Sequence, residues 1–300
     1  MAGRRHKPTD HDDAWRIWII RETMDWYEKF RAEARKDDQR SLDDRFKRTF
    51  TRLVRDISQI QDGARYNVDL LFVEQVSHLK IVESTDGTHP HNAPYMPVTF
   101  DGEPPRECGA GPYCLWAFVN EGRRVAVTVP NIPDSRKTAD IVVHYEDADP
   151  HRRPRWTAVA VPSMFKPSIS HDGEDHQKYQ SLLCVPIALR ISENDAASIS
   201  PVGILSFTCS EPKSFRAVDI EWAWTCASLL AAVLQSYRSN CQRITGTLPS
   251  TDRVISVLHQ IFTPANPRPP VTAFPPPPPP SSAGKQRRFA VVADPRSGTG

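Results

Sequence analysis

Thiols are the side chains in this chain best suited to covalent chemistry. Cys108 and Cys114 are separated by five residues in a segment rich in Gly and Pro, so the two thiols could approach one another. A thiol-dependent redox enzyme needs an accessible, activated thiolate and a second thiol to resolve it. The other cysteines fall in or near apolar runs, where a thiol packs as a small apolar side chain: Cys184, Cys209, Cys226 and Cys241. Because of Cys108 and Cys114, a thiol-dependent enzyme stays an alternative to a protein without catalytic residues.

Histidine and carboxylate clusters occur at two places. The run from His171 to His176 (HDGEDH) has the ligand types for a divalent cation, and His89 and His91 lie two residues apart in a Pro-rich stretch. Both runs are more typical of a solvated polar loop than of a metal site, so we expect no metal. Phosphate-binding glycine loops and the GxSxG and HExxH motifs do not occur. The sequence therefore predicts a protein that is not an enzyme.

Composition narrows the classes of partner. The 300 residues include 38 basic and 36 acidic side chains, for a formal charge of +2. Five basic residues and eleven of the 28 prolines lie in 264–300, which leaves a mildly acidic body, unlike a nucleic-acid-binding domain. No apolar run reaches the ~18 residues of a membrane span, and the N-terminus lacks the apolar stretch of a signal peptide. With six cysteines and no CxxC pair, we expect a cytoplasmic protein with no specific nucleic-acid partner and no membrane partner.

Helical periodicity marks both ends of the expected folded body. Residues 14–35 carry tryptophans at helical spacing, which need a partner surface in this chain or in a second copy. Ser41, with Asp44 three residues later, predicts the start of the clearest amphipathic helix, over 41–62. A third helix, over 216–240, is apolar nearly all round and is expected to be buried on more than one side. Ser250 caps a short last helix.

Alternating or continuous apolar runs predict strands between these helices. Residues 64–84 partly alternate and predict a β-hairpin. The region 85–113 reads as an irregular excursion rich in Pro, Gly and His. Further strands are expected at 115–119, 124–129, 141–144, 158–161, 181–190 and 202–209.

The order of these elements resembles that of the GAF domain family over residues 41–240. ARYNVDLLFVEQVSHLKIVES is similar to the first two strands of that family, and SLLCVPIAL and PVGILSFTC to the last two. Matching motif residues are Pro186, Gly203, Phe215 and Asp219. Gly203 would permit a close backbone approach, Phe215 would plug the turn beneath the helix, and Asp219 suits a first helical turn. The resemblance implies an α+β fold, with an antiparallel sheet carrying helices on one face and irregular loops on the other.

The same resemblance implies a small-molecule sensor or a dimerisation domain. A ligand would lie between the sheet and its covering loops, within reach of Trp116, Phe118, Asp134, Arg136 and Tyr179. Its identity stays unknown, since no Cys-His pair for a bilin and no haem or metal signature is present. Lys213 and Glu221 only partly match the motif of cyclic-nucleotide-binding members. One enzymatic GAF family reduces free methionine sulfoxide with cysteines, and the cysteine spacing here does not reproduce its pattern.

Four parts are predicted along the chain. A polar segment and amphipathic helix (1–40) precede the GAF-like domain (41–245), a short helix (246–263) and a disordered, basic, Pro-rich tail (264–300). The expected function is a sensor that couples a small molecule to a helical, coiled-coil-like interface in a homodimer. The alternative is an interaction protein that binds no ligand. In either case Pro275–Pro280 would adopt polyproline II, which a protein partner with an aromatic groove could bind.

Overall fold

The computed structural model describes the folded body of the chain in segments. These are residues 10–58, 66–74, 78–84, 96–98, 100, 102–103, 109–132, 139–147, 155–165, 180–190, 199–209, 211–212 and 215–259. All of them belong to the first of two units, Met1–Thr263. The second unit, Pro264–Gly300, lies outside the described residues, as does Pro275–Pro280 within it. The four-part division of the chain therefore stays a prediction.

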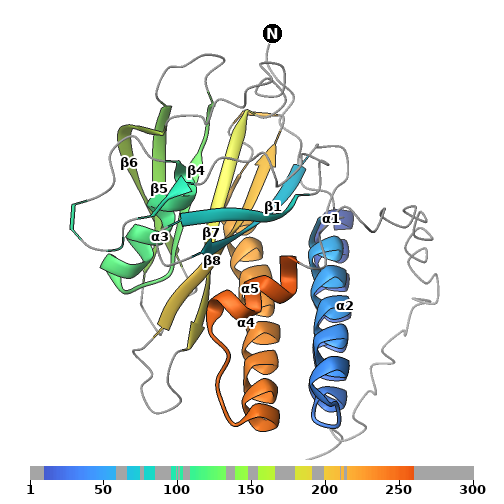
Figure 1. Ribbon diagram of the computed structural model, residues 1–300. Coiled ribbons are helices and arrows are strands. Elements are labelled where there is room, and N and C mark those ends of the chain that lie inside the picture. The colour runs from blue at the N-terminus through green and yellow to red at the C-terminus, as the bar shows by residue number, and fades with distance from the viewer. Residues whose placement is uncertain are drawn as a thin grey trace, which may run out of the picture. The chain divides into compact units, whose positions relative to one another are not determined.

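The described strands form one antiparallel sheet of eight, in the order β3-β2-β1-β8-β7-β4-β5-β6 (Figure 1). The two hairpins expected near the ends of the domain are present, because β1 pairs with β2 and β7 with β8. The strands are β1 (Tyr66–Glu74), β2 (His78–Ser84), β3 (Met96–Pro97), β4 (Val125–Val129), β5 (Ala139–Asp147), β6 (Arg155–Phe165), β7 (Ser181–Arg190) and β8 (Ile199–Cys209). The expected short strands at 141–144 and 158–161 are the middles of β5 and β6.

One face of the sheet carries a layer of long helices, which we call the helix layer. It comprises α1 (Asp10–Ala34), α2 (Gln39–Ser58), α4 (Ala217–Thr245) and α5 (Thr251–His259). The two helices α2 and α5 pack on β1, and α4 packs on β7 and β8 while also contacting α1 and α2. Figure 1 shows α2 and α4 running beside one another below the sheet. The expected placement of the second and third helices against one face is confirmed.

The start of α2 differs from the sequence prediction. Asp38 precedes the helix, and its Oδ1 accepts a hydrogen bond at 2.8 Å from the Ser41 backbone nitrogen. Ser41 therefore lies inside the first turn and donates to the cap, and the predicted capping box with Asp44 is wrong. Ser and Asp are both good N-cap residues, so which of them caps α2 has to be inferred from where the apolar stripe of the helix begins. That stripe begins at Leu42, which is fully buried.

A helix also lies on the opposite face, which we call the α3 face. The run at 115–119 was expected to be a strand, and it belongs instead to α3 (Ala110–Glu121), so that expectation is wrong. The helix ends at Gly122, which has a left-handed backbone (φ 62°), a frequent way to end a helix. A short apolar run cannot separate strand from helix by periodicity alone. The helix packs on β4, β7 and β8.

The strands in the middle of the sheet supply side chains to two cores. Successive residues of β1 alternate, so that Leu70 and Phe72 face the helix layer and Leu71 and Val73 face α3. This burial on both sides explains why β7 and β8 read as continuous apolar runs. The same reasoning explains α4, which lies between the sheet and the other helices. By length and composition α4 could cross a membrane, yet 56% of its most apolar window is buried inside the protein, as in the core helix of a soluble protein.

Candidate functional site

The residues predicted to line a ligand site are only partly described. Trp116 and Phe118 lie on α3, whereas Asp134, Arg136 and Tyr179 lie outside the described residues. The Trp116 indole donates to the Gly102 carbonyl oxygen at 3.2 Å, and its ring lies 5.5 Å from that of Tyr113. Trp116 therefore packs at the margin of α3 with its polar atom satisfied. The predicted ligand-lining set therefore stays a prediction.

Apolar side chains fill the space between α3 and the sheet. Each of the side chains that form this second core is at most 9% exposed. Members from the helix include Tyr113 and Leu115, and members from the strands include Val127 and Ile204. A ligand in this part of the α3 face would have to displace packed side chains or enter at the margin near Trp116.

The thiol pair expected to favour an enzyme is not seen as a pair. Cys108 lies outside the described residues, and Cys114 is fully buried in α3. The Cys114 thiol lies 3.5 Å from the Cys184 carbonyl oxygen, and burial raises the pKa of Cys114 well above its ordinary value. A protonated, inaccessible thiol is a poor nucleophile. The described cysteines are all buried and none of them forms a disulfide: Cys114, Cys184, Cys209, Cys226 and Cys241.

Phe118 is the predicted site residue that connects the two faces. It packs against the core of the helix layer and against the core beneath α3. Its ring lies 6.2 Å from that of Trp224 on α4, within the range of an aromatic pair. α3 is thus in direct contact with the longest helix of the opposite layer, at the end of the sheet where β4 begins.

A charged and aromatic cluster adjoins this contact, and we call it the Arg124 cluster. Arg124 pairs with Glu146 of β5 at 2.7 Å and with Glu221 of α4 at 3.9 Å. Its guanidinium lies 4.7 Å from the ring centroid of Trp224 and 5.7 Å from that of Trp156, both within cation–π range. The Trp156 indole donates to the Glu221 carboxylate at 2.5 Å. Each member is therefore partnered by another, and the cluster joins β4, β5 and β6 to α4.

Sequence reasoning missed the Arg124 cluster. The residues are separated by 22, 10, 65 and 3 positions along the chain, so no local motif carries them. The available signal was that Arg124 directly precedes one strand and Glu146 lies near the end of the next, so the two residues would be neighbours if these strands paired antiparallel. That pairing could be recognised only once the β4–β5 register was known, in which the Glu146 backbone nitrogen bonds to the Arg124 oxygen at 3.1 Å.

The four motif residues lie in β7, in β8 and at the start of α4. A Cβ atom at Gly203 would lie 2.2 Å from the Leu71 carbonyl oxygen, so β1 and β8 approach closely there. Pro186 is buried in β7, opposite Ile204. Phe215 packs against the helix-layer core just before α4. Each role is structural and needs no ligand.

Asp219 completes the start of α4. Its carboxylate accepts from the Arg216 backbone nitrogen at 2.8 Å, and the Arg216 side chain approaches it at 3.3 Å. A carboxylate in the first turn also interacts favourably with the helix dipole. Together these contacts fix the direction in which α4 leaves the sheet.

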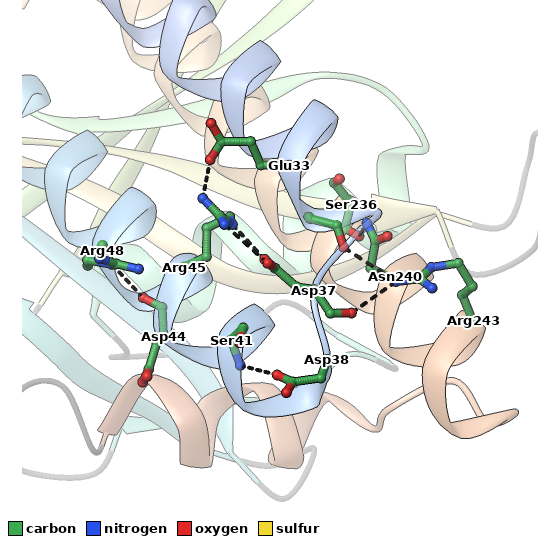
Figure 2. Close-up of polar contacts among 11 residues, drawn as sticks. Glu33, Asp37, Asp38, Ser41, Asp44, Arg45, Arg48, Ser236, Asn240 and Arg243 are labelled. Carbon is green, nitrogen blue, oxygen red and sulfur yellow. Dashed lines mark hydrogen bonds and ion pairs between the residues drawn. The ribbon is translucent and has the colours of Figure 1, made fainter.

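A second polar cluster ties the ends of three helices together. Figure 2 shows Arg45 of α2 between Glu33 of α1 and Asp37, and the Arg45 Nε–Asp37 Oδ2 distance is 2.6 Å. From the last turn of α4, Arg243 donates to the backbone carbonyls of Ala34 and Asp37, each at 3.4 Å. The Ala34 carbonyl is at the end of α1, where a cation is favourable, and Asp37 lies in the turn between α1 and α2. The cluster therefore fixes the α1–α2 turn against α4.

Metal binding finds no support in the part of the chain that is described. There, no three His, Cys, Asp or Glu side chains are arranged to hold an ion. The candidate runs His171–His176 and His89–His91 lie outside the described residues, so their expected role as polar loops stays a prediction.

Comparison with known proteins gives structural matches only, because no protein-family model and no curated protein sequence matches the chain. One similar structure is the phycoerythrobilin-bound GAF domain of a cyanobacterial phytochrome (12% identity, TM-score 0.42, covering 75% of this chain and 97% of that chain). A second is the free methionine-R-sulfoxide reductase of Neisseria meningitidis with its substrate (12% identity, TM-score 0.36, covering 80% of this chain and 99% of that chain). A third is a putative GAF sensor protein of Burkholderia vietnamiensis (10% identity, TM-score 0.35, covering 74% of this chain and 98% of that chain). Likenesses this remote transfer no ligand, substrate or activity to the chain.

The architecture of the chain itself defines its class. The N-terminal hairpin β1–β2 and the C-terminal hairpin β7–β8 lie side by side in one antiparallel sheet, because β1 pairs with β8. The helix before the first hairpin and the helix after the last one pack on the same face. This is the arrangement expected from the sequence resemblance, and the chain has a GAF-like α+β fold.

Proposed function

We propose that this chain is a cytoplasmic, non-catalytic regulatory module that couples a small molecule bound at the α3 face to self-association through the helix layer. The observation that supports the coupling is the position of Phe118, which packs against both cores. None of the described cysteines forms a disulfide, which agrees with a reducing compartment. Burial of Cys114 speaks against a thiol-dependent reductase, because catalysis there needs an accessible thiolate.

The route of coupling follows side chains in contact. A ligand that moves α3 would move Phe118, whose ring lies against Trp224 of α4. The ring of Trp224 also faces Arg124, which is bound to β5 through Glu146. Because packed interiors transmit small displacements, α4 would shift with α3. This route requires no movement of the sheet as a whole.

The helix layer offers a surface for a second copy. Ile17 is 66% exposed and Met24 is 40% exposed, and their separation of seven residues places both on one side of α1. Arg21 and Glu28 are exposed on the same side, so two antiparallel copies of α1 would set each arginine near a glutamate of the other. A homodimer through α1 therefore combines apolar contact with charge complementarity.

The dimer is tested by light scattering with size-exclusion chromatography. The Met24→Glu variant is expected to shift the protein towards a smaller mass. Ser256→Glu is the matched control, because it adds the same charge at an exposed site on α5. A parent protein that is monomeric at micromolar concentration, or equal masses for the two variants, contradicts the α1 contact.

Ligand coupling is tested separately with a nucleotide and metabolite panel. A ligand of the native state raises the melting temperature, and coupling predicts that it also changes the dimer dissociation constant. Trp224→Leu weakens the Phe118–Trp224 contact from outside the predicted ligand-lining set, so it should retain the thermal shift and lose the effect on dimerisation. A ligand that binds and leaves the association of the parent unchanged refutes the coupling while leaving the binding site intact.

The second candidate function is an interaction protein that binds no small molecule. The apolar filling beneath α3 favours it, since no described residue of that core offers an unsatisfied polar group to a ligand. A protein partner would then bind through the α1 surface or through Pro275–Pro280. A silent ligand panel together with a stable homodimer would support this second function over the first.

A further inference from the structure

The strand β6 forms one edge of the sheet, and the middle of the strand is exposed on both faces. Among the described strands it pairs with β5 alone. Its middle residues, Thr157, Ala158, Val159 and Ala160, are all exposed, although their side chains alternate between the two faces. Val159 is a large apolar residue with 46% of its surface exposed. Among the described residues, therefore, neither the helix layer nor α3 covers the middle of this strand.

The register of the sheet shows which backbone groups point outward from β6. The Glu146 backbone nitrogen bonds to β4, so even-numbered residues of β5 direct their backbone groups to β4 and odd-numbered ones to β6. Tyr145 pairs with Thr157 and Val143 with Val159, so these β6 residues bond inward. The N–H and C=O groups of residues 156, 158 and 160 consequently point away from the sheet.

The outward stretch carries none of the usual devices that protect an edge strand. Residues 156–161 are Trp, Thr, Ala, Val, Ala and Val, without the lysines or inward charges that discourage pairing. The register is regular from Ile141–Val161 to Asp147–Arg155, with an irregularity only beyond it. Pro162, which has no N–H, stands at the next outward position and ends the stretch that can donate.

We propose that β6 pairs antiparallel with β6 of a second copy, about a two-fold axis at Ala158. In this register Trp156 lies opposite Ala160 of the second copy, so the largest side chain of the stretch meets one of the smallest. Thr157 lies opposite Val159, a β-branched pair of the kind that stabilises neighbouring strands. No charged side chain lies opposite another over this stretch. Shifting the axis by two residues to Ala160 would lose the match of large and small side chains at Trp156. It would also place Pro162, which has no N–H, at a position that must donate a hydrogen bond to the second copy.

This contact joins two sheets into one continuous sheet of sixteen strands, eight from each copy. It is separate from the α1 surface, which lies on a different helix, and it does not depend on a ligand. A protein that uses both contacts would form assemblies larger than a dimer, because each contact has its own two-fold axis. Failure of one contact therefore does not imply failure of the other.

Charge variants at Ala158 test the pairing. Ala158→Lys and Ala158→Glu each place two like charges opposite one another at the axis, which should raise the dissociation constant roughly tenfold or more. Mixing the two variants places lysine opposite glutamate and should restore association as a heterodimer. Each variant carries Met24→Glu, so that the α1 contact does not contribute, and association is measured by analytical ultracentrifugation. Circular dichroism checks that each variant is folded.

Cysteine crosslinking tests the register without any added charge. Ala158→Cys should crosslink two copies through a short bismaleimide, because the Cβ atoms of opposed residues lie about 5 Å apart. Ala160→Cys is the matched control, since its two copies would be separated by about 13 Å along the strands. The parent protein gives the background from its own thiols. Equal masses for single and mixed charge variants, or crosslinking of residue 160 as efficiently as residue 158, overturns the proposal.

Discussion

The close approach of β1 and β8 at Gly203 makes a sharp prediction for Gly203→Ala. The new Cβ would lie 2.2 Å from the Leu71 carbonyl oxygen and 3.2 Å from a ring carbon of Phe72. Real Cβ atoms essentially never come within 3.0 Å of another heavy atom, so the two backbones would have to separate by nearly 1 Å. The obstructing atom belongs to a central strand and cannot rotate away as a flexible side chain would.

The cost of this separation follows from what the strands hold together. Leu71 contributes to the core beneath α3 and Phe72 to the core of the helix layer, so moving β1 loosens both. Overpacking a close-packed interior costs about 1–3 kcal/mol, and weakening two ladder hydrogen bonds adds about 1–2 kcal/mol. We therefore expect Gly203→Ala to lower the free energy of unfolding by about 3 kcal/mol, a large share of the stability of an ordinary domain.

The matched control is Gly122→Ala. Gly122 has a φ of 62° and nothing within 4 Å of an added Cβ, so the only cost is the left-handed backbone, about 1 kcal/mol. Urea unfolding, followed by tryptophan fluorescence, gives the change in the free energy of unfolding for both variants, and the two are compared at the same m-value. The reasoning is refuted if Gly203→Ala costs no more than Gly122→Ala.

Three further predictions concern polar groups in the described body. Burial lowers the pKa of His144, beside Thr128, from 6.5 to about 4, so the free energy of unfolding is expected to fall by about 3 kcal/mol as the pH drops from about 6.5 to about 4. His144→Gln should remove most of this pH dependence of the urea midpoint. Tyr237→Phe removes the 2.7 Å hydrogen bond to Asp43 and should cost about 1–2 kcal/mol in urea unfolding, whereas an unchanged midpoint would show that water replaces the hydroxyl. Asp38→Ala should lower the melting temperature and Asp38→Asn should retain it, because either Asp or Asn can cap α2; equal losses in both would contradict the capping role.

The long amphipathic and fully apolar segments were the parts of the fold that the sequence could predict. The stripe from Phe46 to Ile57 has helical spacing over several turns, and both ends of the stripe are buried as expected. The strands β7 and β8 were predictable for a different reason. Burial on two faces makes them continuous apolar runs of strand length, bounded by a polar loop.

The errors came from segments in which local signals were short or ambiguous. The α3 helix offers only twelve residues, nearly all apolar, and an alternating run of similar length would look no different in composition. Candidate site residues were harder still, because a site is assembled by register. Arg124 meets Glu221 across nearly a hundred residues of chain, and no local spacing encodes that contact.

The uneven cover of the sheet explains where a signal could act. The strands β1, β8 and β7 are held between α3 and the helix layer, so their backbone has little freedom to move. The strands β5 and β6 have residues exposed on at least one face, and the Arg124 cluster is what joins them to α4. A displacement of the β6 edge by a second copy would therefore reach α4 through Arg124. Arg124→Met should leave both cores folded while uncoupling that edge from the helix layer, because methionine keeps apolar contact with the tryptophan rings and only partly exposed ion pairs are lost.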